Sequence, residues 1–258
     1  MSAKDLVLRP ITSAVANGLI RRVHYSGTVG HAPQLNVGVC LHGRLEGAIQ
    51  FGLPVDKRRS SGIVRGTEWH NFMELNRLAF TEALPRNSES RALSVSFRLL
   101  RKHAPQIKWI VSYADATACG DGAIYRASGF VLTGIRRNTT ILVFPDGERV
   151  ADVLLHNPRV ARRAALARRW GVKVGGGASV QPFLDAGAVR APGYQFRYIR
   201  FLDPSWRSRL TVPEIPFDQI PPECRMIRGV RQLAGGAGNP PAKGGASPTL
   251  PLHASEAD

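Results

Sequence analysis

The chain is poor in cysteine and in acidic residues, and it has no apolar run approaching the roughly 20 residues that a membrane span needs. Its three cysteines, Cys40, Cys119 and Cys224, are too few and too scattered for a disulfide framework, and no cysteine or histidine spacing predicts a zinc site. The N-terminal residues lack the apolar core of a secretory signal. These absences predict a protein that works in a reducing, cytoplasmic setting without a membrane partner.

Positive charge is what the chain has in excess. Among its 258 residues, 35 Lys and Arg against 19 Asp and Glu give a formal net charge of +16. A field of this sign attracts polyanions and favours nucleic acid over acidic small molecules. Charge alone does not name the partner, because part of such a surplus also keeps proteins soluble.

The first two thirds of the chain alternate between strand-like and helix-like patterns. We predict strands over 5–11, 36–41, 45–51, 72–80, 107–113, 130–135 and 194–202, and helices over 12–22, 88–103 and 123–127. A strand, a crossover helix and a second strand require a parallel pair, so the predicted fold is α/β with a mixed central sheet. Residues 52–70 read as a loop whose cations Lys57, Arg58 and Arg59 either contact phosphates or are simply solvated.

The domain organisation follows from shifts in composition. We predict one domain over 1–205 with an Arg-rich helical insertion over about 146–193, an extension over 206–231 and a disordered tail over 232–258. The insertion contains a helix from Arg159 to Lys173 with six cations and no acidic residue between them. Its spacing puts Arg159, Arg162, Arg163 and Arg169 near one face, where several of them would bind DNA phosphates. A solvated helix that serves solubility is the alternative.

One motif resembles the GCN5-related N-acetyltransferases: Tyr125, followed after three residues by Gly129 and Phe130. The resemblance implies that Tyr125 faces an acyl donor and protonates its leaving group, whereas a core anchor is the alternative. That family holds a pyrophosphate on a glycine-rich turn before the crossover helix. Here the turn has no glycine and contains Glu89, so we expect an unusual site for acetyl-CoA or another acyl or aminoacyl donor, formed by Arg86, Asn87, Ser88 and Arg91.

A broader resemblance runs from about residue 10 to residue 202. The segments HYSG (24–27), QFG (50–52), ELNR (74–77), NSESR (87–91), SYAD (112–115) and YRASGF (125–130) resemble the Mom DNA-modification proteins of phage Mu and its prophage relatives. The resemblance implies a divergent acetyltransferase (GNAT)-like fold. It also implies an enzyme that converts adenine in phage or prophage DNA to N6-(carbamoylmethyl)adenine and so protects that DNA from host restriction.

The same resemblance implies partners and site residues. The partners would be double-stranded DNA and a small-molecule donor, in the cytoplasm of a bacterial host, with iron a possible metal. The active-site members would be His24, Arg77, Ser90, Asp115 and Tyr125.

The individual roles are our own inference from chemistry. An exocyclic adenine amine is a poor nucleophile, so the site must orient it, remove a proton and stabilise a leaving group. We expect Asp115, at a strand's carboxyl end, to accept a hydrogen bond from the amine or to act as the base. Tyr125 would donate to the leaving group, and Arg77 would hold an anionic part of the donor or a phosphate. Ser90 and His24 would lie around them, inside a polar surround of Glu74, Asn76 and Ser112.

Bland alternatives and rival functions remain open at this point. In the structural alternative, Arg77 would simply pair with Glu74, Ser90 would cap its helix, and His24 would be a solvated histidine. One rival function is an ordinary N-acetyltransferase acting on an amine or a protein. The other is a non-catalytic nucleic-acid-binding module. The implied product joins nitrogen to a methylene carbon, so the chemistry goes beyond simple acyl transfer.

Overall fold

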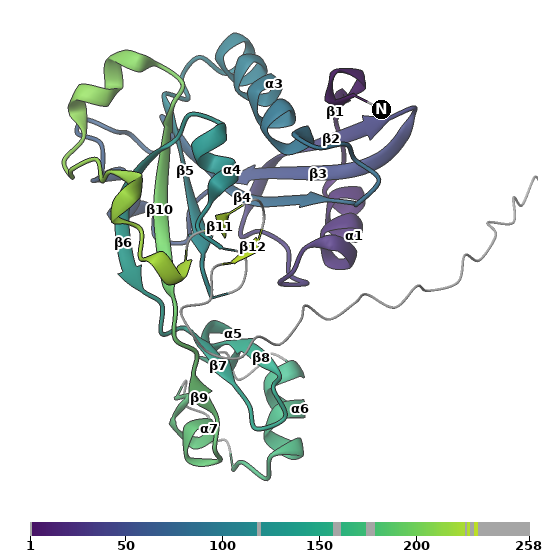
Figure 1. Ribbon diagram of the computed structural model, residues 1–258, viewed down its shortest axis with the longest axis vertical. Coiled ribbons are helices and arrows are strands. Elements are labelled where there is room, and N and C mark those ends of the chain that lie inside the picture. The colour runs from purple at the N-terminus through teal and green to yellow at the C-terminus, as the bar shows by residue number, and fades with distance from the viewer. Residues whose placement is uncertain are drawn as a thin grey trace, which may run out of the picture.

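The main body is a seven-stranded mixed sheet in the order β1-β2-β3-β4-β5-β10-β6, seen in a computed structural model (Figure 1). The structure describes residues 2–117, 120–156, 161–173 and 179–224, and the backbone of 226–227 and 230–231. The strands are β1 (Val7–Pro10), β2 (Pro33–Leu41), β3 (Arg44–Gly52), β4 (Phe72–Phe80), β5 (Trp109–Asp115), β6 (Val131–Arg137) and β10 (Tyr194–Phe201). Only β4 and β5 pair in parallel, which confirms the predicted mixed sheet with one parallel pair.

Local sequence signals fix the element ends. Thr12 caps α1 (Ser13–Val23) by accepting a hydrogen bond from the Val15 N–H. The β2–β3 hairpin turns through His42 and Gly43, whose φ angles of 49° and 80° are both left-handed, as a two-residue hairpin turn requires. The crossover helix α3 (Ser88–His103) connects β4 to β5, and the short α4 (Ala123–Ala127) precedes β6.

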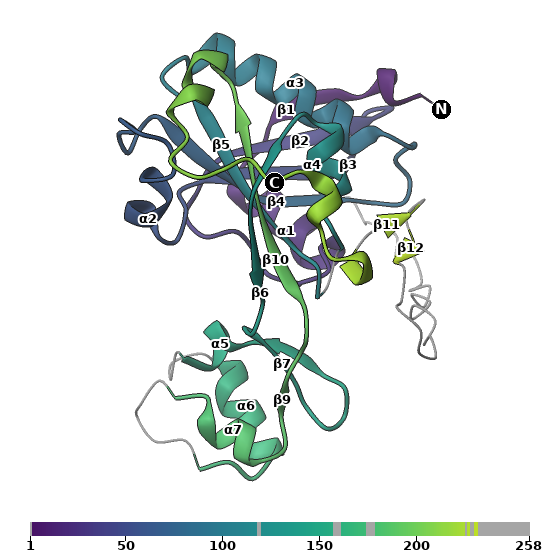
Figure 2. The same cartoon turned by 60° about the vertical axis from the view of Figure 1, so that its left-hand side comes forward.

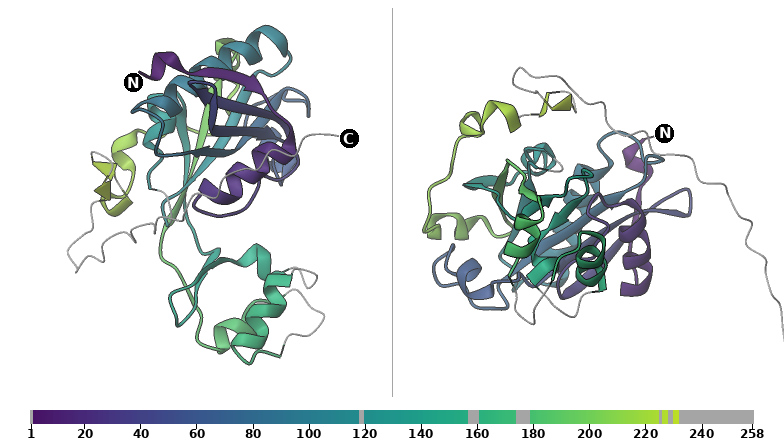
Figure 3. Two further views of the ribbon diagram at one scale, coloured as in Figure 1. Left: turned by 90° about the vertical axis from the view of Figure 1, so that its right-hand side faces the viewer. Right: turned by 90° about the horizontal axis from the view of Figure 1, so that it is seen from below.

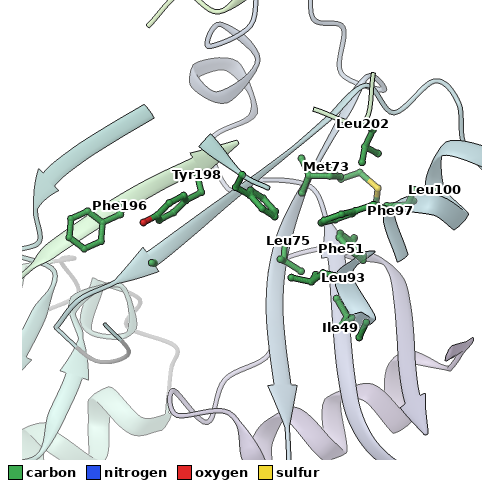
Figure 4. Packing of buried hydrophobic residues seen from close by; sticks show 14 of the residues in the cluster. Ile49, Phe51, Met73, Leu75, Leu93, Phe97, Leu100, Phe196, Tyr198 and Leu202 are labelled. Atoms are coloured by element: carbon green, nitrogen blue, oxygen red, sulfur yellow. The ribbon is translucent and has the colours of Figure 1, made fainter. Parts of the chain in front are cut away.

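Two helices cover opposite faces of the sheet. On one face α3 packs Leu93 and Phe97 against Phe51, Met73 and other side chains of the main core (Figure 4). On the other face α1 packs Leu19 and Ile20 against the small side chains of Ala48 and Ala79. That face carries a second apolar cluster around Phe72 and Trp109, whose rings stack at 4.6 Å. The face of the sheet that α1 covers therefore carries two apolar clusters, and no apolar cluster covers the stretch between them among the described residues.

The predicted loop over 52–70 contains a helical turn that the sequence interpretation missed. Asp56 accepts a hydrogen bond from the Arg59 N–H at 2.9 Å and begins α2 (Lys57–Ser61). Aspartate is a strong N-cap, which overrides the polar, loop-like composition around it.

The insertion forms a small lobe below the sheet in Figure 1, and Figure 2 shows β6 and β10 running down into it. It holds β7 (Ile141–Val143), β8 (Arg149–Ala151), β9 (Val189–Arg190), α5 (Asp152–His156), α6 (Ala161–Arg169) and α7 (Gln181–Asp185). Leu142, Phe144, Leu155 and Phe183 form its own apolar core. The predicted helical insertion thus also contains strands, because the apolar run before residue 146 belongs to it.

Short 3-10 helices occupy the ends of the chain: η1 (Ala3–Asp5), η2 (Pro204–Arg209), η3 (Phe217–Gln219) and η4 (Pro222–Cys224), followed by the strand pair β11 (Met226–Ile227) and β12 (Val230–Arg231). The tail over 232–258, and Arg159 in the predicted basic helix, lie outside the described residues. No helix in the described part of the chain combines the length and the apolar character that crossing a bilayer needs.

Candidate active site

The central opening of the molecule lies where β4 and β5 part. The two strands pair only from Phe72 to Glu74 on β4, and Glu74 lies opposite Val111 of β5. Beyond this point Ser112 bridges the gap, and its hydroxyl donates to the Leu75 carbonyl at 3.1 Å. The carboxyl end of the parallel pair is therefore open, which is where α/β sheets bind ligands.

A β-bulge turns polar side chains of β4 into this opening. Gln50 of β3 lies opposite Arg77 and Phe51 lies opposite Leu75, so Asn76 is the extra residue. Glu74, Asn76 and Arg77 consequently all line one cleft. They fill the gap between the two apolar clusters of the α1 face. These three side chains form the floor of the cleft; of the polar surround that we expected, Glu74 and Asn76 line it and Ser112 does not.

Arg77 fastens the loop after α1 to the sheet. Its Nε donates to the Thr28 carbonyl at 2.8 Å, and Nη2 donates to the Thr28 hydroxyl and the Val29 carbonyl, each at 3.2 Å. Burial lowers the pKa of Arg77, against nearby Tyr25, Glu74 and Tyr125, which raise it. Most of this guanidinium is committed to the protein, which leaves little of it for the anion we expected it to hold.

The loop that Arg77 holds brings His24 to the cleft. The Ser26 N–H donates to His24 Nδ1 at 3.2 Å, which fits a neutral imidazole with its proton on Nε2. Burial, together with the positive charge of Arg77, lowers the pKa of His24 to about 4. The loop must pack tightly, since a Cβ at Gly30 would lie 2.7 Å from the Cβ of Asn76.

Glu74 lies in surroundings that strongly change the pKa of its carboxyl. Burial raises the pKa of its carboxyl to about 7, although the hydrogen bond from Asn76 and the charge of Arg77 both lower it. A carboxyl that exchanges its proton near neutral pH suits acid–base catalysis. The sequence interpretation placed Glu74 only in the polar surround.

Asp115 lines the cleft as expected, but it stands at the junction with the lobe. Its Oδ1 accepts hydrogen bonds from the Thr117 N–H and the Asn138 Nδ2, both at 2.9 Å, and from the Thr117 hydroxyl. The donors Thr117 and Asn138 are buried. This carboxylate therefore holds together the strand ends from which the lobe departs.

Tyr125 packs against the core and also reaches the cleft. Its ring packs 5.2 Å from that of Tyr198 and 5.3 Å from that of Phe130, within the main core, and it also lines the cleft. Gly129, with φ of 74°, ends the short helix as predicted. Ser90 is the one expected active-site member that does not line the cleft; its hydroxyl donates to the Asn87 carbonyl within the first turn of α3.

The turn before α3 does not form the cradle that a pyrophosphate needs. Asn87 adopts a left-handed conformation without a side-chain cap, and the Ser88 hydroxyl donates to the Pro85 carbonyl at 2.5 Å. Of the four expected donor-binding residues, only Arg86 lines the cleft. A glycine-free turn with Glu89 in its first helical turn does not fit a CoA pyrophosphate held in the usual way.

The whole cleft measures about 2120 Å³ and lies between the sheet and the lobe, which faces the sheet in Figure 3. Seven arginines line it: Arg59, Arg77, Arg86, Arg136, Arg149, Arg162 and Arg197. Only four acidic residues do so: Asp56, Glu74, Asp115 and Asp121. The cleft thus concentrates positive charge where two parts of the chain meet.

Sequence reasoning missed several of these residues. Arg136 lies near the end of β6 and Arg149 begins β8, whereas Arg197 lies inside β10, so no local signal common to the three marked them as cleft residues. Beneath the cleft, buried Gln50 donates to Asn17 at 2.9 Å and to Asn36 at 2.8 Å. This network was detectable only as polar residues at inward-facing strand positions.

The cations that we expected to bind DNA differ in whether they line the cleft. Arg59 and Arg162 line the cleft, while Lys57, Arg58 and Arg169 do not. Arg163 is buried at 3% exposure, because α6 packs this face on the lobe core, so its assignment to a DNA surface is wrong. Arg162 and Arg169 both pair with Glu148, at 2.7 and 2.6 Å.

Metal ligation has no basis among the described residues. No group of three His, Cys, Asp or Glu side chains in that part of the chain could hold a metal ion. The iron that we considered possible therefore has no ligand set among the described residues.

Comparison with known proteins gives one strong match. A model of the Mom protein family matches residues 5–219. The methylcarbamoylase Mom of Escherichia phage Mu is 31% identical over 211 residues, which are 81% of this chain and 80% of that protein.

Solved structures give weaker likenesses. The ribosomal-protein-S18-alanine N-acetyltransferase of Escherichia coli is 11% identical, with a TM-score of 0.41 over 77% of this chain and 94% of that one. A GNAT family acetyltransferase of Elizabethkingia anophelis with acetyl-CoA bound is 13% identical, with a TM-score of 0.39 over 76% of this chain and 98% of that one. Scores this low add nothing to the assignment of the site.

Proposed function

The chain belongs to the Mom protein family, and from that membership we propose that it is a transferase that converts adenine in phage or prophage DNA to N6-(carbamoylmethyl)adenine. The relative from phage Mu is named a methylcarbamoylase, and it matches over four fifths of both chains. The observation in this chain that carries the proposal is the cleft itself, with its polar floor of Glu74, Asn76 and Arg77 under an arginine-rich opening.

The cleft is large enough for two substrates. Pockets for single small molecules occupy about 300–1,000 Å³, and this one is about 2120 Å³. An adenine N6 inside a duplex is inaccessible, so the target nucleotide must be flipped out of the stack to reach the floor. The second occupant is a small-molecule donor that supplies the carbamoylmethyl group.

The exposed arginines suit the DNA partner. Arg59, Arg136, Arg149 and Arg162 are exposed and line the cleft from both the sheet and the lobe. Phosphate contacts from two sides would fix a duplex over the opening without reading its sequence. Tyr25, exposed at 59% on the same rim, offers an aromatic face to an extruded base.

Three cleft residues have defined tasks in this proposal. Tyr125 donates its hydroxyl proton toward the leaving group, and its packing against Tyr198 and Phe130 fixes its ring. Neutral His24, held by Ser26, offers Nε2–H as a hydrogen-bond donor to the substrate. Asp115 supports the junction of sheet and lobe and so sets the shape of the cleft.

The test is nucleoside mass spectrometry of a plasmid co-expressed with the chain. We expect an adenosine species in which one N6 hydrogen is replaced by a carbamoylmethyl group, and a clear reduction with Tyr125→Phe, which removes only a hydroxyl. Plasmid from cells with an empty vector is the control. Unmodified plasmid with the intact chain would contradict the proposal. Binding of DNA without modification would then favour the non-catalytic rival, and acetylated amines or proteins the ordinary acetyltransferase.

A further inference from the structure

Glu74 lies at the point where β4 and β5 part. It is the last β4 residue paired with β5, and its side chain lines the cleft. The charged and titratable groups that face it are Arg77 from its own strand and Tyr113 from β5. On β3 the residue opposite is Gly52, where a Cβ would lie 2.5 Å from Asn76 Oδ1, so this glycine lets the Asn76 side chain pack closely against the strand. Asn76 donates a hydrogen bond that orients it.

The other acidic residues of the cleft hold the protein together. Asp56 caps α2, and Asp115 secures the lobe junction through Thr117 and Asn138. Asp121 pairs with Arg126 at 2.9 Å and accepts a hydrogen bond from the Ala123 N–H. Glu74, by contrast, has its hydrogen-bonding partner Asn76 on its own strand, so that bond does not tie separate elements together.

Resting on the proposed function, we infer that Glu74, and not Asp115, is the general base that takes the proton from adenine N6. The N6 lone pair forms a bond to the methylene carbon of an activated carbamoylmethyl donor. The bond from that carbon to its leaving group breaks, and the leaving group keeps the electron pair. The N6–H bond breaks, and its proton passes to the Glu74 carboxylate, while the second N6 hydrogen stays in the product.

The surroundings of Glu74 favour this transfer. Burial holds the pKa of its carboxyl at about 7, so near neutral pH it is ionised in part and takes up a proton readily. Arg77 keeps the ionised form accessible by its charge, and Arg77 itself is anchored on the loop through Thr28. The β-bulge at Asn76 fixes all three side chains on one short stretch of strand.

The experiment compares two Glu→Gln variants in the co-expression assay. Glu74→Gln keeps the shape but cannot accept a proton, and we expect a loss of product by about 10²-fold or more. Glu46→Gln on neighbouring β3 is the matched control: its carboxyl is 14% exposed and accepts a hydrogen bond from Thr81, but it does not line the cleft. This variant should form product at the level of the intact chain.

A second measurement separates catalysis from a structural role. In cell extract that supplies the donor, product formation by the intact chain should rise through about pH 7, and Glu74→Asp should displace this rise. Glu74→Gln should also melt at or above the temperature of the intact chain at pH 8, because a buried charge is removed. Equal product from Glu74→Gln and the intact chain overturns the inference alone. Absence of product from the intact chain overturns the proposed function and this inference with it.

Discussion

Two carboxylates on the same face of the sheet have opposite surroundings. At the parting of β4 and β5, Glu74 is buried with one amide donor, and burial raises its pKa to about 7. At the lobe junction, Oδ1 of Asp115 receives three hydrogen bonds from Thr117 and Asn138. Glu74 stands where the parallel pairing of β4 with β5 ends, and Asp115 is the last residue of β5, so position at the open end of the pair does not decide their roles. The number of hydrogen-bond donors around each carboxylate decides them. The site of Glu74 favours proton transfer, and the site of Asp115 favours a fixed geometry.

The largest expected effect lies at the lobe junction. Asp115→Ala removes one acceptor from three hydrogen bonds and leaves the donors of Thr117 and Asn138 buried, which should cost about 2–4 kcal/mol of unfolding free energy. Chemical denaturation measures it. Asp115→Asn, which keeps one carbonyl acceptor, should recover part of the loss. An Asp115→Ala variant as stable as the intact chain, yet without product, would return Asp115 to the role of base.

A smaller effect is expected on the pH dependence of stability, through His24 in the cleft. The pKa of His24 is lowered from 6.5 to about 4, so the stability that its neutral form gives is present above pH 6.5 and is lost as the pH falls through 4. His24→Asn should remove this acid-side loss, on the order of 1 kcal/mol after allowance for partial solvent screening. Melting curves from pH 4 to pH 7 measure it against His103→Asn, an exposed control on α3. Parallel curves for the two variants would show that His24 is not desolvated in solution.

The smallest effect on stability is expected on the lobe. Arg162→Ala/Arg169→Ala removes exposed ion pairs to Glu148 and should change the unfolding free energy by less than about 1 kcal/mol. If these side chains contact phosphates, the salt slope of log K for DNA should fall by up to about 2 × 0.9 units. Arg98→Ala/Arg101→Ala on α3, away from the cleft, makes the same change in net charge and should leave the slope almost unaltered. Equal slopes for both double variants would remove the lobe from the DNA surface.

The sequence predicted the order of the elements because their signals are local. The Thr12 cap, the turn at Gly43 and the tyrosine–glycine–phenylalanine motif each depend on neighbours within a few residues. The site depends on long-range pairing. The bulge at Asn76 exists only in the register between β3 and β4, and the donors to Asp115 include Asn138, 23 residues later.

The same limit explains the errors on single residues. Helical spacing placed Arg163 beside Arg162, but which face of α6 meets the lobe core depends on Phe144 and Leu155, which are distant in sequence. Ser90 lies in a segment that resembles the family, yet its hydroxyl remains within its own helical turn. Spacing gives the face of an element, and only the packed fold says what that face meets.

The place of β10 between β5 and β6 has a consequence for how the chain reaches its folded state. This strand is synthesised last of the three, after the roughly 50 residues of the lobe, and until it arrives β5 and β6 each expose an unpaired edge. The Asn138 N–H donates to the Gly193 carbonyl at 2.9 Å, so a lobe that folds on its own core brings both its ends together. It thereby shortens the effective loop that β10 must close and lowers the entropic barrier to docking. The lobe would then serve as a folding clamp that limits the time in which those two edges can recruit another chain.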